Sequence, residues 1–208
     1  MKSAADIMTL SPVIPVLVID SAETAVPLAR ALLAGGLRVL EVTLRSDAAL
    51  ASITAIAKAV PEAVVGAGTV LNAADFKRST DAGARFIVSP GITDQILSSA
   101  KQSDIPLLAG VATAGEIMRG LDAGLAHFKF FPAQSSGGAA AVKAFAGPFA
   151  KVRFCPTGGI TPTNARDYLA LDNVLCVGGS WLAPEKLVAN GDWKAITQLA
   201  SEAAALGK

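Results

Sequence analysis

A lysine stands inside a run of aromatic residues that has the composition of a buried β-strand, HFKFFP at residues 127–132. Burial disfavours an ammonium ion and therefore favours the neutral amine. A neutral amine is the nucleophile that forms an imine with a ketone. Lys129 is thus a candidate for Schiff-base chemistry, and the alternative is a lysine that reaches solvent from the end of a strand.

A carboxylate and a guanidinium lie on one face of another expected strand, VLEVTLR at residues 39–45. Side chains alternate between the two faces of a strand, so Glu41 and Arg45 point the same way as Val39 and Thr43. Ionised groups are almost never fully buried unless they are paired. The pattern indicates either a structural contact between Glu41 and Arg45 or a general acid–base beside an arginine that binds a carboxylate.

Two consecutive expected strands finish in a glycine pair, at 158–159 and at 178–179. Glycine lets the backbone approach an anion closely, and backbone N–H groups at a helix N-terminus bind phosphate. Thr161 and Pro162 after the first pair predict a helix start, as N-cap and first helical residue. Tight turns alone would explain either pair, but the two together predict a phosphate site.

Other residues that could do chemistry give weaker signals. The chain has one histidine, His127, and two cysteines, Cys155 and Cys176, without a Cys-x-x-Cys pattern, which disfavours a zinc enzyme. We expect His127 to be structural and both thiols to be buried and inert. The run GAG at 66–68 lacks the third glycine of a dinucleotide fingerprint, although Thr69 places a hydroxyl at the end of its strand.

Short β-rich runs alternate with Ala- and Leu-rich helical runs along the whole chain, which predicts a parallel sheet. The expected strands are residues 13–19, 39–44, 64–70, 86–90, 106–111, 127–131, 153–157 and 174–178, and helices are expected at 22–34, 48–59, 73–81 and 93–101. Glycines at 35–36, 83, 124 and 147 are expected to end helices. Eight such units predict a single (β/α)8 TIM barrel, with a doubly wound open sheet as the alternative.

The length of 208 residues favours one domain, so we expect residues 1–208 to form a single (β/α)8 barrel. The chain is 52% hydrophobic and 17% charged with a net charge of +1, which excludes a disordered chain and the basic footprint of a nucleic-acid-binding protein. The N-terminus lacks the pattern of a secretory signal, and no apolar stretch approaches the ~20 residues of a membrane span. We expect a cytoplasmic protein, and the low charged fraction favours buried contacts between subunits.

In a barrel, the candidate residues gather at the carboxyl ends of the strands, where barrel active sites lie. One amine, one carboxylate, one guanidinium and a phosphate site suit a phosphorylated 2-oxo acid that reacts through a Schiff base. Two alternatives remain: another phosphate-binding barrel, such as a sugar-phosphate isomerase or epimerase, and a non-enzymatic module that binds a phosphate ligand or flavin mononucleotide.

Six ordered motifs resemble the 2-dehydro-3-deoxy-phosphogluconate (KDPG) aldolase family: EVTLR at 41–45, GAGTV at 66–70, SPG at 89–91, FKFFPA at 128–133, RFCPTGGI at 153–160 and GGSW at 178–181. The resemblance implies a homotrimeric class I aldolase of the Entner–Doudoroff pathway that needs no cofactor or metal. It implies cleavage of 2-dehydro-3-deoxy-6-phospho-D-gluconate to pyruvate and D-glyceraldehyde 3-phosphate. Members of this family often also act on 4-hydroxy-2-oxoglutarate.

The resemblance also implies roles for individual residues. Lys129 would be the Schiff-base nucleophile and Glu41 the proton carrier. The substrate-binding residues would be Arg45 and Thr69 at the carboxylate, Thr157 at the C4 hydroxyl, and Gly158, Gly159, Gly179 and Ser180 at the phosphate. Pro90 and Phe131 are further expected substrate-binding residues. Two positions depart from many relatives, which carry Glu where this chain has Gln134 and Ser where it has Ala112.

Overall fold

Eight parallel strands alternate with helices in the computed structural model, which describes residues 3–207. The strands are β1 (Val13–Leu17), β2 (Val39–Thr43), β3 (Val64–Gly68), β4 (Ile87–Val88), β5 (Leu107–Val111), β6 (His127–Phe130), β7 (Arg153–Pro156) and β8 (Val177–Gly179). The helices are α1 (Ala4–Met8), α2 (Ala22–Ala34), α3 (Ala49–Ala59), α4 (Ala73–Asp81), α5 (Asp94–Lys101), α6 (Ala114–Asp122), α7 (Gly138–Ala144), α8 (Ala165–Leu169), α9 (Glu185–Ala189) and α10 (Trp193–Ala204), followed by the 3-10 turn η1 (Ala205–Gly207).

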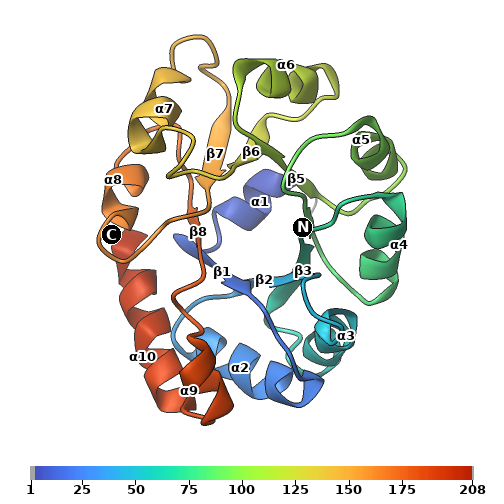
Figure 1. Ribbon diagram of the computed structural model, residues 1–208, viewed down its shortest axis with the longest axis vertical. Coiled ribbons are helices and arrows are strands. Elements are labelled where there is room, and N and C mark those ends of the chain that lie inside the picture. The colour runs from blue at the N-terminus through green and yellow to red at the C-terminus, as the bar shows by residue number, and fades with distance from the viewer. Residues whose placement is uncertain (1–2, 208) are drawn as a thin grey trace.

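The strands form a (β/α)8 barrel, which confirms the predicted fold. Their order is β7-β6-β5-β4-β3-β2-β1-β8, and parallel bridges from Phe154 to Val174 and from Thr157 to Gly178 join the two ends. Figure 1 looks into the ring of strands, with the helices around it. Because the first and last strands meet, the open doubly wound sheet is the wrong alternative.

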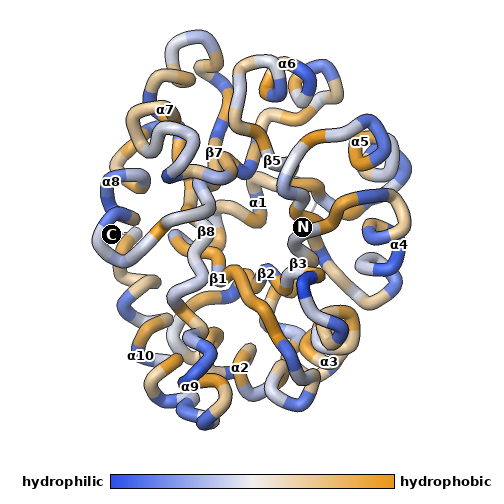
Figure 2. The backbone as a smooth tube through the Cα atoms, in the orientation of Figure 1, coloured by the Kyte–Doolittle hydropathy of each residue, from blue (hydrophilic) through white to orange (hydrophobic). Residues whose placement is uncertain are grey.

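Two hydrophobic clusters follow from the alternation of side chains along each strand. Inward-facing residues from β1 to β5, with both cysteines, pack against Ile7 and Met8 of α1 at one end of the barrel. The strand residues that alternate with these inward-facing ones, such as Leu40 and Val42 of β2, point outward and pack against the helices. The predicted division of residues 39–45 into two faces is therefore confirmed, and the outer helices alternate hydrophobic and hydrophilic positions (Figure 2).

Most predicted helix ends agree with the structure. Helices α2 and α4 have the predicted bounds, and Gly36, Gly83 and Gly124 follow their helices with positive φ angles of 95°, 96° and 85°. The predicted stop at Gly147 is wrong, because α7 already ends at Ala144. Within residues 3–207, no helix is long and apolar enough to cross a bilayer.

The predicted helix start at Thr161 is one turn early, because α8 begins at Ala165. Thr161 still organises the turn before it: its N–H donates to Oδ1 of Asn164 at 2.8 Å, and its carbonyl accepts from the N–H of Ala165. The strand predicted at 86–90 is also shorter, and Pro90 has no N–H with which to extend the ladder.

Candidate active site

A buried ion pair lies inside the barrel toward the carboxyl ends of β2 and β6. Nζ of Lys129 donates a hydrogen bond to Oε1 of Glu41 at 3.1 Å, and the two residues are only 5% and 2% exposed. A side chain on Gly68 of β3 would collide with Oε1 of Glu41, so this glycine makes room for the carboxylate. Glu41 thus pairs with Lys129, and the alternative pairing with Arg45 is not observed.

The Lys129 amine also lies against an aromatic ring. Nζ is 5.1 Å from the ring centroid of Phe131, a cation–π distance. The amine therefore has a carboxylate and the face of a ring as neighbours, in a site from which most solvent is excluded.

Arg45 and Thr69 lie at the ends of neighbouring strands. Nε of Arg45 donates to Oγ1 of Thr43 at 3.1 Å, and Thr43 in turn donates to the carbonyl of Leu17 at 2.8 Å. Thr69 has a φ angle of 57°, a left-handed conformation that is uncommon for a residue with a side chain and is often found at functional sites. A fixed guanidinium and a nearby hydroxyl suit a carboxylate ligand.

The two glycine pairs contribute differently to the site. Gly158 and Gly159 have positive φ angles of 99° and 74°, which glycine adopts without strain. In the second pair, a side chain on Gly178 would collide with Oγ1 of Thr157, and one on Gly179 would collide with the ring of Trp181. Gly178 therefore leaves space for Thr157, whereas Gly179 packs against an indole.

These residues surround one cavity of about 270 Å³. Its walls come from the ends of β1, β2, β3, β6, β7 and β8 and the loops after them, together with the loop after β4. The lining residues are Val16, Thr43, Arg45, Thr69, Pro90, Lys129, Phe131, Thr157, Gly158, Gly159, Ile160, Gly178 and Ser180. The structure therefore brings together the predicted site residues, with Glu41 behind Lys129 and Gly179 outside the cavity wall.

Four lining residues were not predicted: Val16, Thr43, Ile160 and Gly178. Thr43 could have been found, because it shares the inward face of β2 with Glu41 and Arg45. Gly178 belongs to a predicted glycine pair, and only the bridge between Thr157 and Gly178 shows which member faces the cavity. Val16 and Ile160 are ordinary aliphatic residues, so their sequence gives no signal.

His127 and the two cysteines lie outside the cavity wall. Burial and the nearby Arg153 guanidinium lower the pKa of His127, which lies at the amino end of β6. Burial and a hydrogen bond with Cys155 raise the pKa of Cys176 well above its ordinary value. Both thiols are buried, as expected, and form no disulfide. No three His, Cys, Asp or Glu side chains in residues 3–207 are grouped to hold a metal ion.

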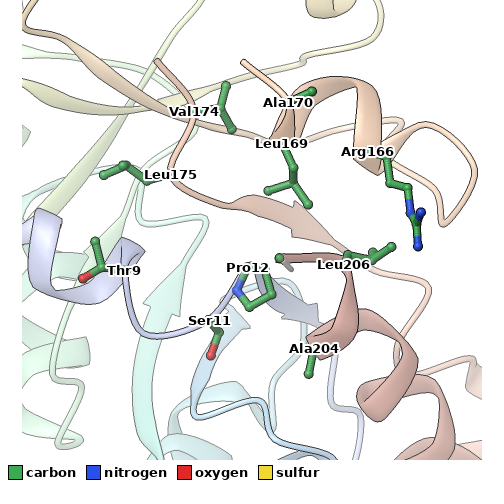
Figure 3. Close-up of a pocket in the computed structure, with 11 residues that line it drawn as sticks. Thr9, Ser11, Pro12, Arg166, Leu169, Ala170, Val174, Leu175, Ala204 and Leu206 are labelled. Carbon is green, nitrogen blue, oxygen red and sulfur yellow. The ribbon is translucent and has the colours of Figure 1, made fainter. Parts of the chain in front are cut away.

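A larger cavity of about 600 Å³ lies near the amino ends of β1 and β8 (Figure 3). Its walls come from the segment before β1, from α8 and the segment before β8, and from the end of α10 with η1. Arg166 is the one charged side chain among its described lining residues, and aliphatic side chains such as Leu169 and Leu206 supply much of the rest. This cavity has no convergent set of reactive groups.

Comparison with known proteins gives one consistent family. The family model "KDPG and KHG aldolase" matches residues 4–199. The KHG/KDPG aldolase of Escherichia coli strain K12 is 57% identical over 201 residues, which cover 97% of this chain and 94% of the relative.

Solved structures agree with the sequence comparison. A KDPG aldolase from Legionella pneumophila, with pyruvate captured at low pH as a covalent carbinolamine intermediate, has a TM-score of 0.93 at 48% identity and covers 95% of this chain and 96% of its own. The 2-keto-3-deoxy-6-phosphogluconate aldolase of Zymomonas mobilis with 3-phosphoglycerate also has a TM-score of 0.93, at 52% identity, with coverages of 97% and 95%.

Proposed function

The chain belongs to the KDPG and KHG aldolase family, and we propose that its 270 Å³ cavity is the active site of a class I aldolase. The enzyme cleaves 2-dehydro-3-deoxy-6-phospho-D-gluconate to pyruvate and D-glyceraldehyde 3-phosphate. It also cleaves 4-hydroxy-2-oxoglutarate to pyruvate and glyoxylate. The observation that carries this proposal is the buried pair of Lys129 and Glu41 at the floor of a cavity that also holds a guanidinium and a pair of left-handed glycines.

The first half of the reaction forms an imine. Glu41 takes a proton from Nζ of Lys129, and the neutral amine attacks C2 of the substrate to give a carbinolamine. Glu41 then returns a proton to the hydroxyl on C2, which leaves as water. The resulting protonated imine withdraws electrons from the neighbouring carbons. The Legionella relative with its covalent pyruvate carbinolamine supports this step.

The second half breaks the C3–C4 bond and then releases pyruvate from Lys129. Glu41, directly or through a water molecule, removes the proton of the C4 hydroxyl, and the C3–C4 bond breaks as the aldehyde leaves. The bonding electrons move into the imine and form an enamine on Lys129. Glu41 gives its proton to C3, and water then attacks the imine carbon, which frees pyruvate and the amine.

Binding groups flank the reacting carbons on both sides. Arg45 and Thr69 hold the substrate carboxylate, as their position at the ends of β2 and β3 favours. Pro90 and Phe131 enclose the carbons near Lys129. The backbone of Gly158 and Gly159 binds the phosphate together with Ser180, and the Zymomonas relative with 3-phosphoglycerate supports a phosphate ligand in this family. Gly179, which was also predicted at the phosphate, packs against Trp181 outside the cavity wall.

The test is to trap the imine. Pyruvate with borohydride should inactivate the enzyme and add one pyruvate-derived mass per chain, on the peptide that contains Lys129. Lys129→Arg keeps a positive charge but removes the nucleophile, so it should lose the adduct and more than about 10⁴-fold of turnover, beyond the usual range of one acid–base group. Lys143→Arg on the surface of α7 is the matched control and should behave like the wild type.

Two results would contradict this mechanism. One is an adduct that maps to a different lysine. The other is activity that disappears with EDTA and returns with zinc, because a metal would then polarise the carbonyl in place of the imine.

The proposed setting is a homotrimer in the cytoplasm, acting in the Entner–Doudoroff pathway. Exposed apolar side chains favour subunit contacts: Val18 and Leu71 lie after β1 and β3, and Met118 and Leu121 lie on α6. Two free thiols suit a reducing compartment. Residues 1–208 form one domain in this proposal. Sedimentation at micromolar concentration should give a trimer, and a monomer would contradict the assembly.

A further inference from the structure

Gln134, which follows the strand that bears Lys129, packs directly on the first glycine pair. A Cβ atom built on Gly159 would lie 2.6 Å from Cβ of Gln134. Real Cβ contacts are essentially never that short, so the Gln134 side chain occupies the space that any other residue at 159 would need. The two residues therefore fit together only because position 159 is glycine.

The other end of the Gln134 side chain is held by helix α8. The hydroxyl of Tyr168 donates a hydrogen bond to Oε1 of Gln134 at 2.9 Å, and Tyr168 is only 1% exposed. Burial, and then the Asp167 carboxylate, raise the pKa of Tyr168, so its hydroxyl keeps the proton that it donates. A buried tyrosine hydroxyl usually finds a partner, and Gln134 is that partner here.

The backbone around this contact extends the pairing between β6 and β7 into their loops. The N–H of Ala133 donates to the carbonyl of Thr157 at 2.8 Å, and the N–H of Gln134 donates to the carbonyl of Gly158 at 3.0 Å. On the other side, Nδ2 of Asn164 donates to the carbonyl of Gly159 at 3.0 Å. Gly158 and Gly159 are thus bound from the Lys129 strand and from the turn before α8.

We infer that Gln134 is a positioning residue that sets the preference of the enzyme for phosphorylated over unphosphorylated 2-oxo acids. This inference rests on the proposed function. The side chain holds Gly159 from one side while Tyr168 holds the side chain, so the backbone N–H groups of the pair keep one direction. A preorganised set of donors binds an anion more tightly than a loop that must first be ordered. Gln134 therefore affects binding of the phosphate group of the substrate and does not affect imine formation at Lys129.

Kinetics with two substrates test this positioning role. Gln134→Ala keeps the Cβ atom but removes the rest of the side chain, including the acceptor for Tyr168. KM for 2-dehydro-3-deoxy-6-phosphogluconate should therefore rise roughly five- to twentyfold, about the effect of one or two neutral hydrogen bonds. Its kcat/KM for unphosphorylated 4-hydroxy-2-oxoglutarate should stay within about twofold of wild type, because binding energy at a remote group is absent there. Tyr168→Phe removes only the donor and should give a smaller rise in the same KM.

Two further variants separate positioning from a general structural role. Gln134→Glu keeps the chain length and an oxygen acceptor for Tyr168, so it should recover most of what Gln134→Ala loses. Ser135→Ala is the matched control, because its hydroxyl bonds only within the same loop, to the carbonyl of Pro132. It should match the wild type with both substrates. Melting temperatures identify any variant that is merely unstable.

Calorimetric titration with inorganic phosphate provides a measurement that does not need turnover. Gln134→Ala should weaken phosphate binding about as much as it raises KM for the phosphorylated substrate. Equal losses for both substrates, or no change in phosphate affinity, would overturn the inference. A wild type that binds phosphate without cleaving either substrate would refute the aldolase function, and the phosphate affinity of Gln134→Ala would then still decide the role of Gln134.

Discussion

The inward-facing residues of the barrel strands form two levels, one near the amino ends of the strands and one near the carboxyl ends. The same alternation of side chains gives an apolar level at the amino ends and a reactive level at the carboxyl ends. At the amino-end level, apolar residues such as Val39, Val64 and Leu108 pack against α1. One or two inward positions further along, the level near the carboxyl ends holds Glu41 and Lys129. Period-two alternation determines which residues point inward, and the residue type at each inward position determines whether that level is apolar or reactive.

The cavities at the two ends show the same contrast. The cavity near the amino ends of β1 and β8 is about 600 Å³, and the cavity above Lys129 is about 270 Å³. Only the smaller one combines an amine, a guanidinium and glycines in left-handed conformations. Convergent polar groups therefore mark the site better than volume does.

Among changes at the carboxyl-end level, removal of the proton carrier Glu41 should cause the largest loss of kcat. Glu41→Gln keeps the shape of the side chain but cannot exchange a proton, so kcat should fall about 10²- to 10⁴-fold. Circular dichroism should show an unchanged fold. Glu185→Gln, an exposed change on α9, is the control and should leave kcat as in the wild type. Near-normal turnover with an unchanged pH profile would exclude Glu41.

The opposite result is expected at the level near the amino ends. Leu108 is 3% exposed, so Leu108→Ala should lower the free energy of unfolding by about 2–5 kcal/mol through lost burial and a residual cavity. The kcat of the folded enzyme should stay within about twofold, because no group of this level touches substrate. Denaturant unfolding and steady-state kinetics measure the two effects. A large loss of kcat in folded protein would show that the two levels are not separate.

Enlarging a glycine tests the phosphate end of the cavity. Gly159→Val places a β-branched side chain at a φ of 74° and against Gln134, so the loop must move. For the phosphorylated substrate kcat/KM should fall roughly 10- to 100-fold, since strain of this kind costs about 1–3 kcal/mol. For 4-hydroxy-2-oxoglutarate the loss should be much smaller. Equal losses for both substrates would place the phosphate elsewhere.

Much of the fold and of the site could be predicted from the sequence, for identifiable reasons. The eight strands follow from alternating β-rich and Ala-rich runs, and the site follows from charged residues on an inward strand face. The contacts between elements could not be predicted. That Gly68 makes room for Glu41, and that Tyr168 reaches Gln134, depends on residues 27 and 34 positions apart that only the closed barrel brings together. The predicted start of α8 is one turn early for the same reason, because Thr161 organises a turn through Asn164 without starting the helix.

Thr157 offers the finest test of how the carboxyl-end level selects its substrate. Its hydroxyl lines the cavity, and its contacts within the protein are long: 3.4 Å to the carbonyl of Cys155 and 3.9 Å to the Cys155 sulfur. Such a weakly engaged hydroxyl is available to the middle of a substrate that extends from Lys129 to Gly159. We therefore expect Thr157 to contact the C4 hydroxyl and to distinguish the gluconate from the galactonate configuration.

Replacing this hydroxyl by a methyl group keeps the volume and removes one hydrogen bond. Thr157→Val should lower the ratio of kcat/KM for the gluconate over the galactonate epimer by about three- to tenfold, the size of one neutral hydrogen bond. Thr9→Val is the matched control, because Thr9 lines the cavity near the amino ends and bonds only to carbonyls of α1. The control should leave the ratio unchanged. If Thr157→Val also leaves the ratio of kcat/KM for the two epimers unchanged, this hydroxyl does not select the configuration at C4. Other groups or the shape of the cavity would then do so.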